Sequence, residues 1–239
     1  METVGAATMK KVKHIGIVGC SAEGAALCYR TICVQGADLK GEYSHPEVTM
    51  NTHSFGEYVK HIRAGNWYGV AGLMLSSAEK VAKARADFLI CPDNTIHYAF
   101  DLVAEKSPLP WLHIAEIVAA EAKRRNFKYV GVLGTQYLIE GPVYSAKLSA
   151  VGIKHLIPEA DERKRINHII FDELVNSHFT DKSHAYLVGG ISRLKGKGCD
   201  AVVLGCTEIP LLITEENSPL PTLDSTRLLA KAALIKATR

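Results

Sequence analysis

The strongest constraint on the fold is that several segments of this sequence occur twice. Residues 13–20, Lys-His-Ile-Gly-Ile-Val-Gly-Cys, reappear at 128–135 as Lys-Tyr-Val-Gly-Val-Leu-Gly-Thr, an offset of 115 residues. In the same order, 87–93 matches 200–206 at an offset of 113, and Ser-Pro-Leu-Pro at 107–110 recurs at 218–221 at an offset of 111. Solenoid repeats have periods of roughly 20 to 50 residues. The longer period predicts an α/β fold with two pseudo-symmetric parallel-sheet half-domains that face each other across one cleft.

Length and composition agree with two small domains. The 239 residues divide into halves of about 110 to 120 residues, each long enough to bury its own core. A hydrophobic content of 47% and a charged content of 22% are typical of folded domains. The net charge is +3, and the densest basic clusters, 123–125 and 163–165, are typical of solvated helix surfaces. We therefore expect no nucleic-acid partner.

The sequence also bears on location and metal binding. Met1 to Lys11 has no secretory pattern, and no run reaches about 18 apolar residues, so we expect a cytoplasmic protein without a membrane partner. The six cysteines form no Cys-x-x-Cys pair and have no metal-ligand spacing with the ten histidines. We expect reduced thiols and no metal site.

Periodicity and punctuation predict strands that alternate with helices, the pattern of parallel sheets in α/β layers. The predicted strands are 14–18, 48–52, 88–91, 129–133, 155–157 and 201–204. The predicted helices are one through Leu27 and Tyr29, then 55–63, 69–84, 142–150, 161–176, 183–196 and 225–236. The last helix has no counterpart after a third strand, so we expect it to cross back onto the first half. The predicted half-domains are 1–116 with 222–239, and 117–221.

Ligands of open parallel sheets bind at the carboxyl ends of the strands, where the first turn and the loops of Asp93 and Cys206 must lie. The repeat would then bring Asp93 and Cys206 to one ligand from opposite sides. The pattern Gly16-x-x-Gly19-x-Ser21 with Gly24 exposes backbone N–H groups at a helix start, which suits a carboxylate or phosphate. It is not Gly-x-Gly-x-x-Gly, and no P-loop is present, so no nucleotide cofactor is expected.

Around the two repeated strand ends, the chain resembles the aspartate/glutamate racemase family of cofactor-independent amino-acid racemases. Gly-Cys-Thr-Glu-Ile at 205–209 is similar to the second catalytic motif of the family. Asn94-Thr95 with His97 is similar to the first, which is normally Cys-Asn-Thr followed by a histidine. Further similar segments are 112–115, Gly134-Thr135, and 158–163 followed by Ile166-Asn167.

The resemblance implies two acid/base groups on opposite faces of an amino acid's α-carbon, without pyridoxal phosphate or another cofactor. Cys206 is implied as one of them, because a free thiol with a pKa of about 8.5 lies close enough to neutrality to be tuned for either role. The partner of the enzyme would be a small amino acid or dicarboxylate, and the family makes a homodimer the expected assembly.

The chain departs from the family at the first catalytic position. Asp93 precedes Asn94-Thr95, and the nearby cysteine, Cys91, lies two residues earlier. The repeat aligns Asp93 with Cys206, but Cys91 has the same strand parity as Asp93, so both stay candidates for the second acid/base group. With an ordinary pKa of about 3.9, Asp93 would need burial to act as an acid. An alternative is that Asp93 caps a helix that begins near Asn94.

The predicted binding residues come from the same loops. Ser21, Asn94, Thr95, Thr135 and Thr207 are expected to hold the substrate carboxylate, and Glu208 to orient a neighbouring group. Arg163 and Lys164 would reach a second carboxylate, although 161–165 also reads as an ordinary helix start. The leading substrates are aspartate and glutamate. However, Leu138 stands where the family usually has a second threonine.

Two other functions remain open at this stage. One is a single-cysteine reaction of the same superfamily, such as isomerisation of a maleate-like diacid or decarboxylation of a malonate. The other is a catalytically silent carboxylate-binding protein.

Overall fold

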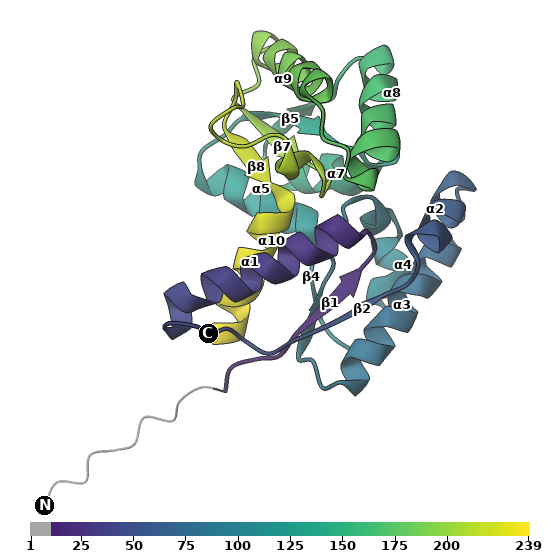
Figure 1. The fold of residues 1–239 in the computed structure, drawn as a ribbon, viewed down its shortest axis with the longest axis vertical. Coiled ribbons are helices and arrows are strands. Elements are labelled where there is room, and N and C mark those ends of the chain that lie inside the picture. The colour runs from purple at the N-terminus through teal and green to yellow at the C-terminus, as the bar shows by residue number, and fades with distance from the viewer. Residues whose placement is uncertain (1–10) are drawn as a thin grey trace, which may run out of the picture.

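The computed structural model describes residues 11–239. It contains two four-stranded sheets of parallel strands, which lie one above the other in Figure 1. The first has the order β2-β1-β3-β4 and the second β6-β5-β7-β8, so the two halves share one topology. All their strand pairs are parallel. The predicted fold class is confirmed.

The first half follows the predicted alternation. Its strands are β1 (Ile15–Gly19), β2 (Val48–Thr52), β3 (Phe88–Ile90) and the short β4 (Trp111–Leu112). Its helices are α1 (Ala22–Lys40), α2 (Phe55–Arg63), α3 (Trp67–Lys83), the 3-10 helix η1 (Thr95–Ala99) and α4 (Phe100–Ala104). β1 and β3 are buried along their whole length, as expected for central parallel strands with helices on both faces.

The second half repeats this plan. Its strands are β5 (Tyr129–Leu133), β6 (Lys154–Leu156), β7 (Ala201–Leu204) and β8 (Thr222–Asp224). Its helices are α6 (Gln136–Ile139), α7 (Pro142–Ala150), α8 (Ala160–His168), α9 (Asp181–Gly196) and the 3-10 helix η4 (Ile209–Leu211). The helix predicted over 161–176 is not continuous: after α8 the chain passes through a π-helical turn, η2 (Ile169–Glu173), and a 3-10 turn, η3 (Leu174–Asn176).

The repeated residues make equivalent hydrogen bonds in the two halves. The Asp87 carboxylate accepts the N–H of His14 at 2.6 Å, and the Asp200 carboxylate accepts the N–H of Lys128 at 2.7 Å. Within the repeated Ser-Pro-Leu-Pro segments, the serine hydroxyl donates to the carbonyl two residues later, at 2.8 Å from Ser107 and 2.7 Å from Ser218. The repeat thus fixes how the central strands begin and how the chain enters β4 and β8.

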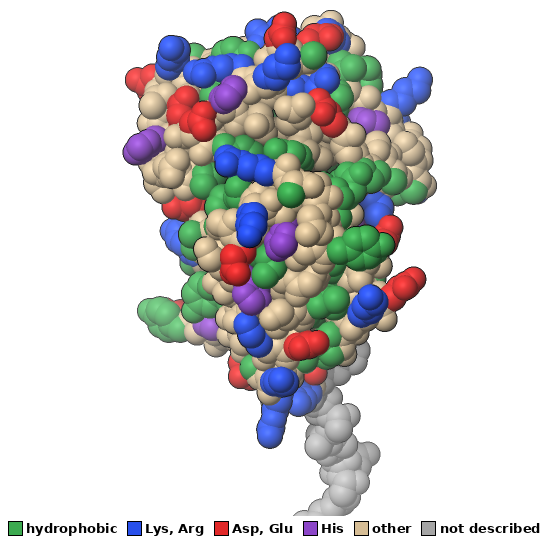
Figure 2. Space-filling model, turned by 90° about the vertical axis from the view of Figure 1, so that its right-hand side faces the viewer, with side chains coloured by type: hydrophobic (Ala, Val, Ile, Leu, Met, Phe, Trp, Pro, Cys, Tyr) green, Lys and Arg blue, Asp and Glu red, His purple; other side chains and the backbone are tan. Residues whose placement is uncertain are grey.

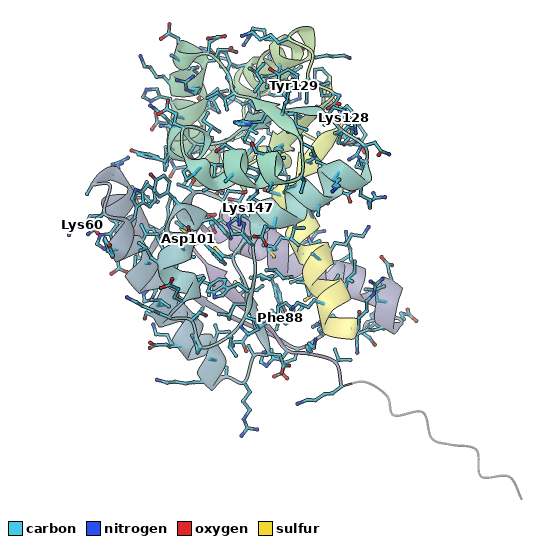
Figure 3. The ribbon with its side chains drawn as sticks, turned by 180° about the vertical axis from the view of Figure 1, so that it is seen from behind. Lys60, Phe88, Asp101, Lys128, Tyr129 and Lys147 are labelled. Atoms are coloured by element: carbon cyan, nitrogen blue, oxygen red, sulfur yellow. The ribbon has the colours of Figure 1, made fainter. Side chains whose placement is uncertain are left out.

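Two helices link the halves by crossing between them. α5 (Ile114–Arg124) follows β4 of the first sheet but packs with Val130 and Val132 of the second. α10 (Ser225–Thr238) follows β8 of the second sheet but packs with Ile15 and Ile17 of the first. In Figure 1, α10 descends in yellow from the upper half to lie beside α1. From behind, Phe88 at the start of β3 lies in the lower half near α10, while Tyr129 at the start of β5 lies in the upper half (Figure 3).

The predicted crossing of the last helix is therefore correct, but the statement that this helix lacks a counterpart is wrong. α5 is its counterpart, and β4 and β8 are the fourth strands of the two sheets, which the sequence analysis missed. The division of the chain at 116/117 and 221/222 stays a prediction. The prediction for the N-terminus falls on residues 1–11, of which all but Lys11 lie outside the described part.

The surface and the helices add two observations. On the face shown in Figure 2, Lys and Arg side chains are interspersed with Asp and Glu over both halves. Within residues 11–239, every helix is too short or too polar to cross a membrane.

Candidate active site

A small cavity, with a free volume of about 30 Å³, lies between the two halves, at the carboxyl ends of their central strands. Its polar lining contains most of the residues predicted from the sequence: Ser21, Asp93, Asn94, Thr95, Thr135, Cys206, Thr207 and Glu208, with Cys20 beside them. The structure thus brings together the loops after β1, β3, β5 and β7.

Asp93 is held by the start of α1. Its carboxylate accepts the backbone N–H of Cys20 at 3.2 Å and that of Ser21 at 3.2 Å. The alternative that Asp93 caps its own helix is wrong, because Asn94 occupies the cap position of η1 and no side chain there bonds a helix N–H. Burial, reinforced by the negative charge of Glu208, raises the pKa of Asp93 to about 7, although the N–H groups at Ser21 oppose the shift. Asp93 can therefore exchange a proton near neutral pH.

Cys206 is paired with a carboxylate. Its Sγ–H donates to Oε2 of Glu208 at 2.9 Å, and the Thr207 hydroxyl donates to the same oxygen at 2.8 Å. Burial and the neighbouring charge of Glu208 raise the pKa of the Cys206 thiol well above its ordinary value. Cys206 is therefore a protonated thiol at neutral pH. The second oxygen of Glu208, Oε1, is buried without a hydrogen-bond partner.

Two hydroxyl pairs join the halves across the cavity. The hydroxyls of Ser21 and Thr207 lie 3.1 Å apart, and those of Thr95 and Thr135 lie 2.8 Å apart. Ser21 and Thr135 also cap α1 and α6, because their hydroxyls accept helix N–H groups. These hydrogen bonds hold the two walls of the cavity together, and the hydroxyls present polar atoms to it.

Asn94 is fixed from the second half. Its amide oxygen accepts the hydroxyl of Tyr144 at 2.6 Å, and its amide nitrogen donates to the Ser225 hydroxyl at 3.0 Å. Ser225 in turn donates to the carbonyl of Leu204 at the end of β7. Tyr144 and Ser225 are residues that motif reasoning missed, because they hold the site from outside the motifs.

Cys91 is placed differently from Asp93. It is completely buried, does not line the cavity, and directs its thiol to the Asp93 carbonyl at 3.7 Å. Burial and the charge of Asp93 raise the pKa of the Cys91 thiol. Its position therefore suits packing beneath Asp93 better than contact with a ligand.

Two histidines support the same loop. Nδ1 of His97 lies 2.8 Å from the carbonyl oxygen of Asp93, and Nε2 lies 3.5 Å from the N–H of Ile114. His113 caps α5 by accepting the N–H of Ala115 at 3.2 Å. Burial lowers the pKa of both rings, that of His113 to about 4. They are neutral rings that bond the backbone.

Arg163 and Lys164 do not line the cavity. Arg163 donates to Glu140 at 2.9 Å and to the carbonyl of Pro158 at 2.9 Å. Lys164 is 65% exposed and lies 3.6 Å from Asp161. Their predicted contact with a second substrate carboxylate stays a prediction, and in this geometry their charges are directed elsewhere.

The rest of the lining is apolar and was not predicted. Phe55 and Ile62 come from α2 of the first half, while Ile170, Phe171 and Val175 come from η2 and η3 of the second. A π-helical turn such as η2 often marks a functional site. No lysine or arginine is among the lining residues, and within residues 11–239 no cluster of His, Cys, Asp and Glu has a geometry that would hold a metal ion.

Comparison with known proteins identifies relatives. The family model described as Asp/Glu/Hydantoin racemase matches residues 3–233. The broad specificity amino-acid racemase RacX of Bacillus subtilis is 26% identical over 163 residues, which cover 67% of this chain and 69% of RacX.

Solved structures of similar proteins share the fold. A protein from Yersinia pestis described as a candidate Asp/Glu racemase superposes with a TM-score of 0.86 at 28% identity, covering 95% of this chain and 100% of that one. An aspartate racemase homologue from Pyrococcus horikoshii gives a TM-score of 0.80 at 26% identity over the same shares. The expectation of an isomerase is thus confirmed at the level of the family, since its named relatives are amino-acid racemases. The matched length, together with the two half-domains and the shared cavity, shows that this chain belongs to the Asp/Glu/Hydantoin racemase family.

Proposed function

We propose that this protein is an amino-acid racemase that works without a cofactor, with Asp93 and Cys206 as its two acid/base groups. The observation that carries the proposal is that these two residues, which occupy equivalent positions in the repeat, line one cavity from opposite halves. An inversion needs a group on each face of the α-carbon, and the pseudo-symmetry provides two such groups.

The protonation states favour one order of events. At neutral pH a substantial share of Asp93 is ionised, since its pKa is raised only to about 7, whereas Cys206 keeps its proton. Asp93 removes the α-proton, and the electron pair of the broken C–H bond is delocalised into the substrate carboxylate. The Cys206 thiol then gives its proton to the opposite face and becomes a thiolate. The resulting form, protonated Asp93 with thiolate Cys206, accepts the other enantiomer by the reverse steps.

The surrounding groups stabilise the carbanion. Asn94, Thr95 and Thr207, with Ser21 and Thr135, supply donors to the substrate carboxylate, where negative charge develops as the proton leaves. Glu208 positions the thiol by accepting its hydrogen bond. Cys91 remains the other candidate for the second base, but it would need to turn from the Asp93 carbonyl to reach a substrate.

The remaining features stay proposals. Aspartate and glutamate enter as substrates through the resemblance, and the expected homodimer and cytoplasmic location enter in the same way. The apolar lining of the cavity does not support an acidic substrate.

The test follows the α-hydrogen of each enantiomer of several amino acids by proton NMR in deuterated water. We expect exchange with inversion in the native protein, and loss of inversion in both Cys206→Ala and Asp93→Asn. Retained inversion in Asp93→Asn but not in Cys91→Ala would assign the second base to Cys91. No exchange with any amino acid would reject the racemase and leave the one-sided isomerase, the decarboxylase or the silent binder.

A further inference from the structure

The side-chain end of the cavity has no positive charge. Recognition of a second carboxylate requires a cation or several donors, because an unpaired buried carboxylate is strongly destabilising. The lining contains no lysine or arginine. Of the basic residues of α8, Arg163 pairs with Glu140 and Arg165 with Glu173 at 3.7 Å, while the exposed Lys164 lies 3.6 Å from Asp161.

The cavity already holds two acidic side chains. Asp93 and Glu208 both line it, and the charge of Glu208 disfavours ionisation of Asp93. A dicarboxylic amino acid would add a third and a fourth carboxylate to the same cavity. Repulsion between like charges is strong where water is largely excluded. A substrate with a single carboxylate adds one negative charge fewer and so reduces this cost.

One acceptor in the cavity lacks a donor. Oε1 of Glu208 is buried and has no hydrogen-bond partner, while Oε2 of the same carboxylate accepts two. A buried carboxylate oxygen normally has a donor. A substrate ammonium group would supply both the missing hydrogen bond and the compensating charge.

The apolar wall comes from both halves. Phe55 of α2 and Phe171 and Val175 of the η2–η3 segment are only partly buried, and each presents surface to the cavity. The two turns also reach the first half directly, because the Ser177 hydroxyl donates to Glu23 of α1 at 2.8 Å. Covering this apolar surface with an apolar ligand group is favourable, because it removes the surface from contact with water.

We propose that the site is specific for amino acids with a single carboxylate and an apolar side chain, which lies against Phe55, Phe171 and Val175 while the ammonium group meets Glu208. This inference rests on the proposed racemase activity and names its substrate class. It predicts that aspartate and glutamate are poor substrates, contrary to the expectation from the resemblance.

The experiment compares three amino acids of similar shape in the deuterium-exchange assay: leucine, asparagine and aspartate. Leucine is apolar, asparagine is polar and neutral, and aspartate is charged, so the series separates polarity from charge. We expect kcat/KM for exchange to fall in that order, with leucine at least about tenfold above aspartate. Aspartate equal to or above leucine would overturn the inference while leaving the racemase intact.

A variant pair tests the location of the pocket. Val175→Arg introduces a cation at the apolar wall, and Val175→Met is the uncharged control of similar length. Val175→Arg should raise the ratio of aspartate to leucine activity by about tenfold or more, whereas Val175→Met, which keeps the wall apolar, should not raise it. An unchanged ratio in a folded Val175→Arg protein would contradict the assignment of this wall.

A binding measurement keeps the inference testable if no amino acid exchanges. The thermal unfolding temperature of the native protein is then measured with each of the three amino acids. A rise with leucine but not with aspartate supports the apolar substrate class even though the racemase proposal fails. Equal rises, a larger rise with aspartate, or no rise with any of them would overturn the inference.

Discussion

The carboxylate of Asp93, at the end of β3, accepts the backbone N–H of Ser21 at the start of α1 at 3.2 Å. A helix N-terminus stabilises negative charge, so this contact favours the ionised carboxylate. Burial acts in the opposite direction and dominates, since the pKa of Asp93 is raised to about 7. The N-terminus of α1 therefore keeps the Asp93 carboxylate able to ionise, whereas burial alone would hold it neutral.

Replacing Asp93 should separate function from stability. Asp93→Asn keeps an oxygen that can accept the Ser21 N–H but cannot take up the α-proton. We expect inversion to fall by about 10²- to 10⁴-fold, the usual contribution of a general acid/base group. One-sided exchange through Cys206 should appear only at alkaline pH, where the thiol ionises and can remove and return a proton on the same face. NMR in deuterated water measures both rates.

The same variant should be more stable at neutral pH. The folded-state pKa of Asp93 lies above its ordinary value of 3.8, so the folded protein binds more protons between about pH 4 and 7, and stability falls as pH rises through that window. Asp93→Asn removes this loss, and we expect a gain of at least about 1 kcal/mol at pH 8, or about 2–4 °C. Thermal unfolding at pH 8 and pH 4 tests the sign, and a gain that is equal at both pH values would contradict it.

The pH dependence of catalysis should follow the two acid/base groups. Activity in the order proposed above requires ionised Asp93 and protonated Cys206. We expect kcat/KM to rise as pH increases through about 7 and to fall only at alkaline pH, where the thiol ionises. Because enantiomers have equal free energies, the two directions must have equal kcat/KM and the same profile. A flat profile between pH 6 and 8 would exclude Asp93 as the base.

Glu208→Gln should shift both the rise and the fall of kcat/KM to lower pH. The charge of Glu208 raises the pKa of Asp93 and, with the hydrogen bond to Sγ, the pKa of Cys206. Glutamine keeps the shape without the charge, so both pKa values should fall. The rate of Cys206 alkylation by iodoacetamide, measured against pH, reports the thiol directly. Cys206→Ala identifies the background from the other cysteines, and an unchanged titration would show that Glu208 does not act on the thiol.

The repeat explains why so much of this fold was predictable. Asp87 and Asp200 accept the N–H groups at the starts of β1 and β5, so the residues that recur in the sequence are those that set strand register. Register then places Asp93 and Cys206 at equivalent strand ends. The loops of the polar site could be predicted because local sequence decides where a central strand stops.

The features that were missed depend on long-range packing. β4 spans two residues, too few to show a period, and without it the equivalence of α5 and α10 was hidden. Each of these helices packs on the sheet of the other half. This depends on how the two sheets are placed relative to each other, which no local sequence pattern shows. Phe55 and Phe171 entered the cavity from outside every motif. Arg163 was predicted to reach a second substrate carboxylate, and its pairing with Glu140, on a neighbouring segment, could not be foreseen from the sequence.

Gly24 should be required for closure of the two halves. A Cβ at Gly24 would lie 2.4 Å from Cγ2 and 2.6 Å from Cβ of Thr207 in the other half. Thr207 is held by hydrogen bonds to Ser21 and Glu208, so relief would require separating the cavity walls. We expect Gly24→Ala to destabilise the fold by about 1–3 kcal/mol and to reduce activity at least about tenfold.

A matched glycine separates this clash from helix propensity. Gly72 lies in α3, and a Cβ there would meet no atom within 4 Å. Gly72→Ala should therefore stabilise the protein by up to about 1 kcal/mol with unchanged activity. Thermal unfolding and the exchange assay are measured on both variants. Equal behaviour of the two would show that the contact between Gly24 and Thr207 does not limit the packing of the halves.

The buried histidines should make the protein sensitive to acid. Burial lowers the pKa of His113 to about 4, below its ordinary value of 6.5, so the unfolded chain binds more protons between these values and stability is lost as pH falls through that window. His113→Asn keeps an acceptor for the N–H of Ala115, because asparagine is a preferred helix cap, but it does not titrate. The loss of unfolding free energy between pH 7 and pH 5 should be smaller in the variant by about 1–2 kcal/mol. Urea unfolding at both pH values measures this difference, and the lost ring packing adds only an offset that is independent of pH. An equal loss of unfolding free energy between pH 7 and pH 5 in the two proteins would show that protonation of His113 does not cause the acid sensitivity.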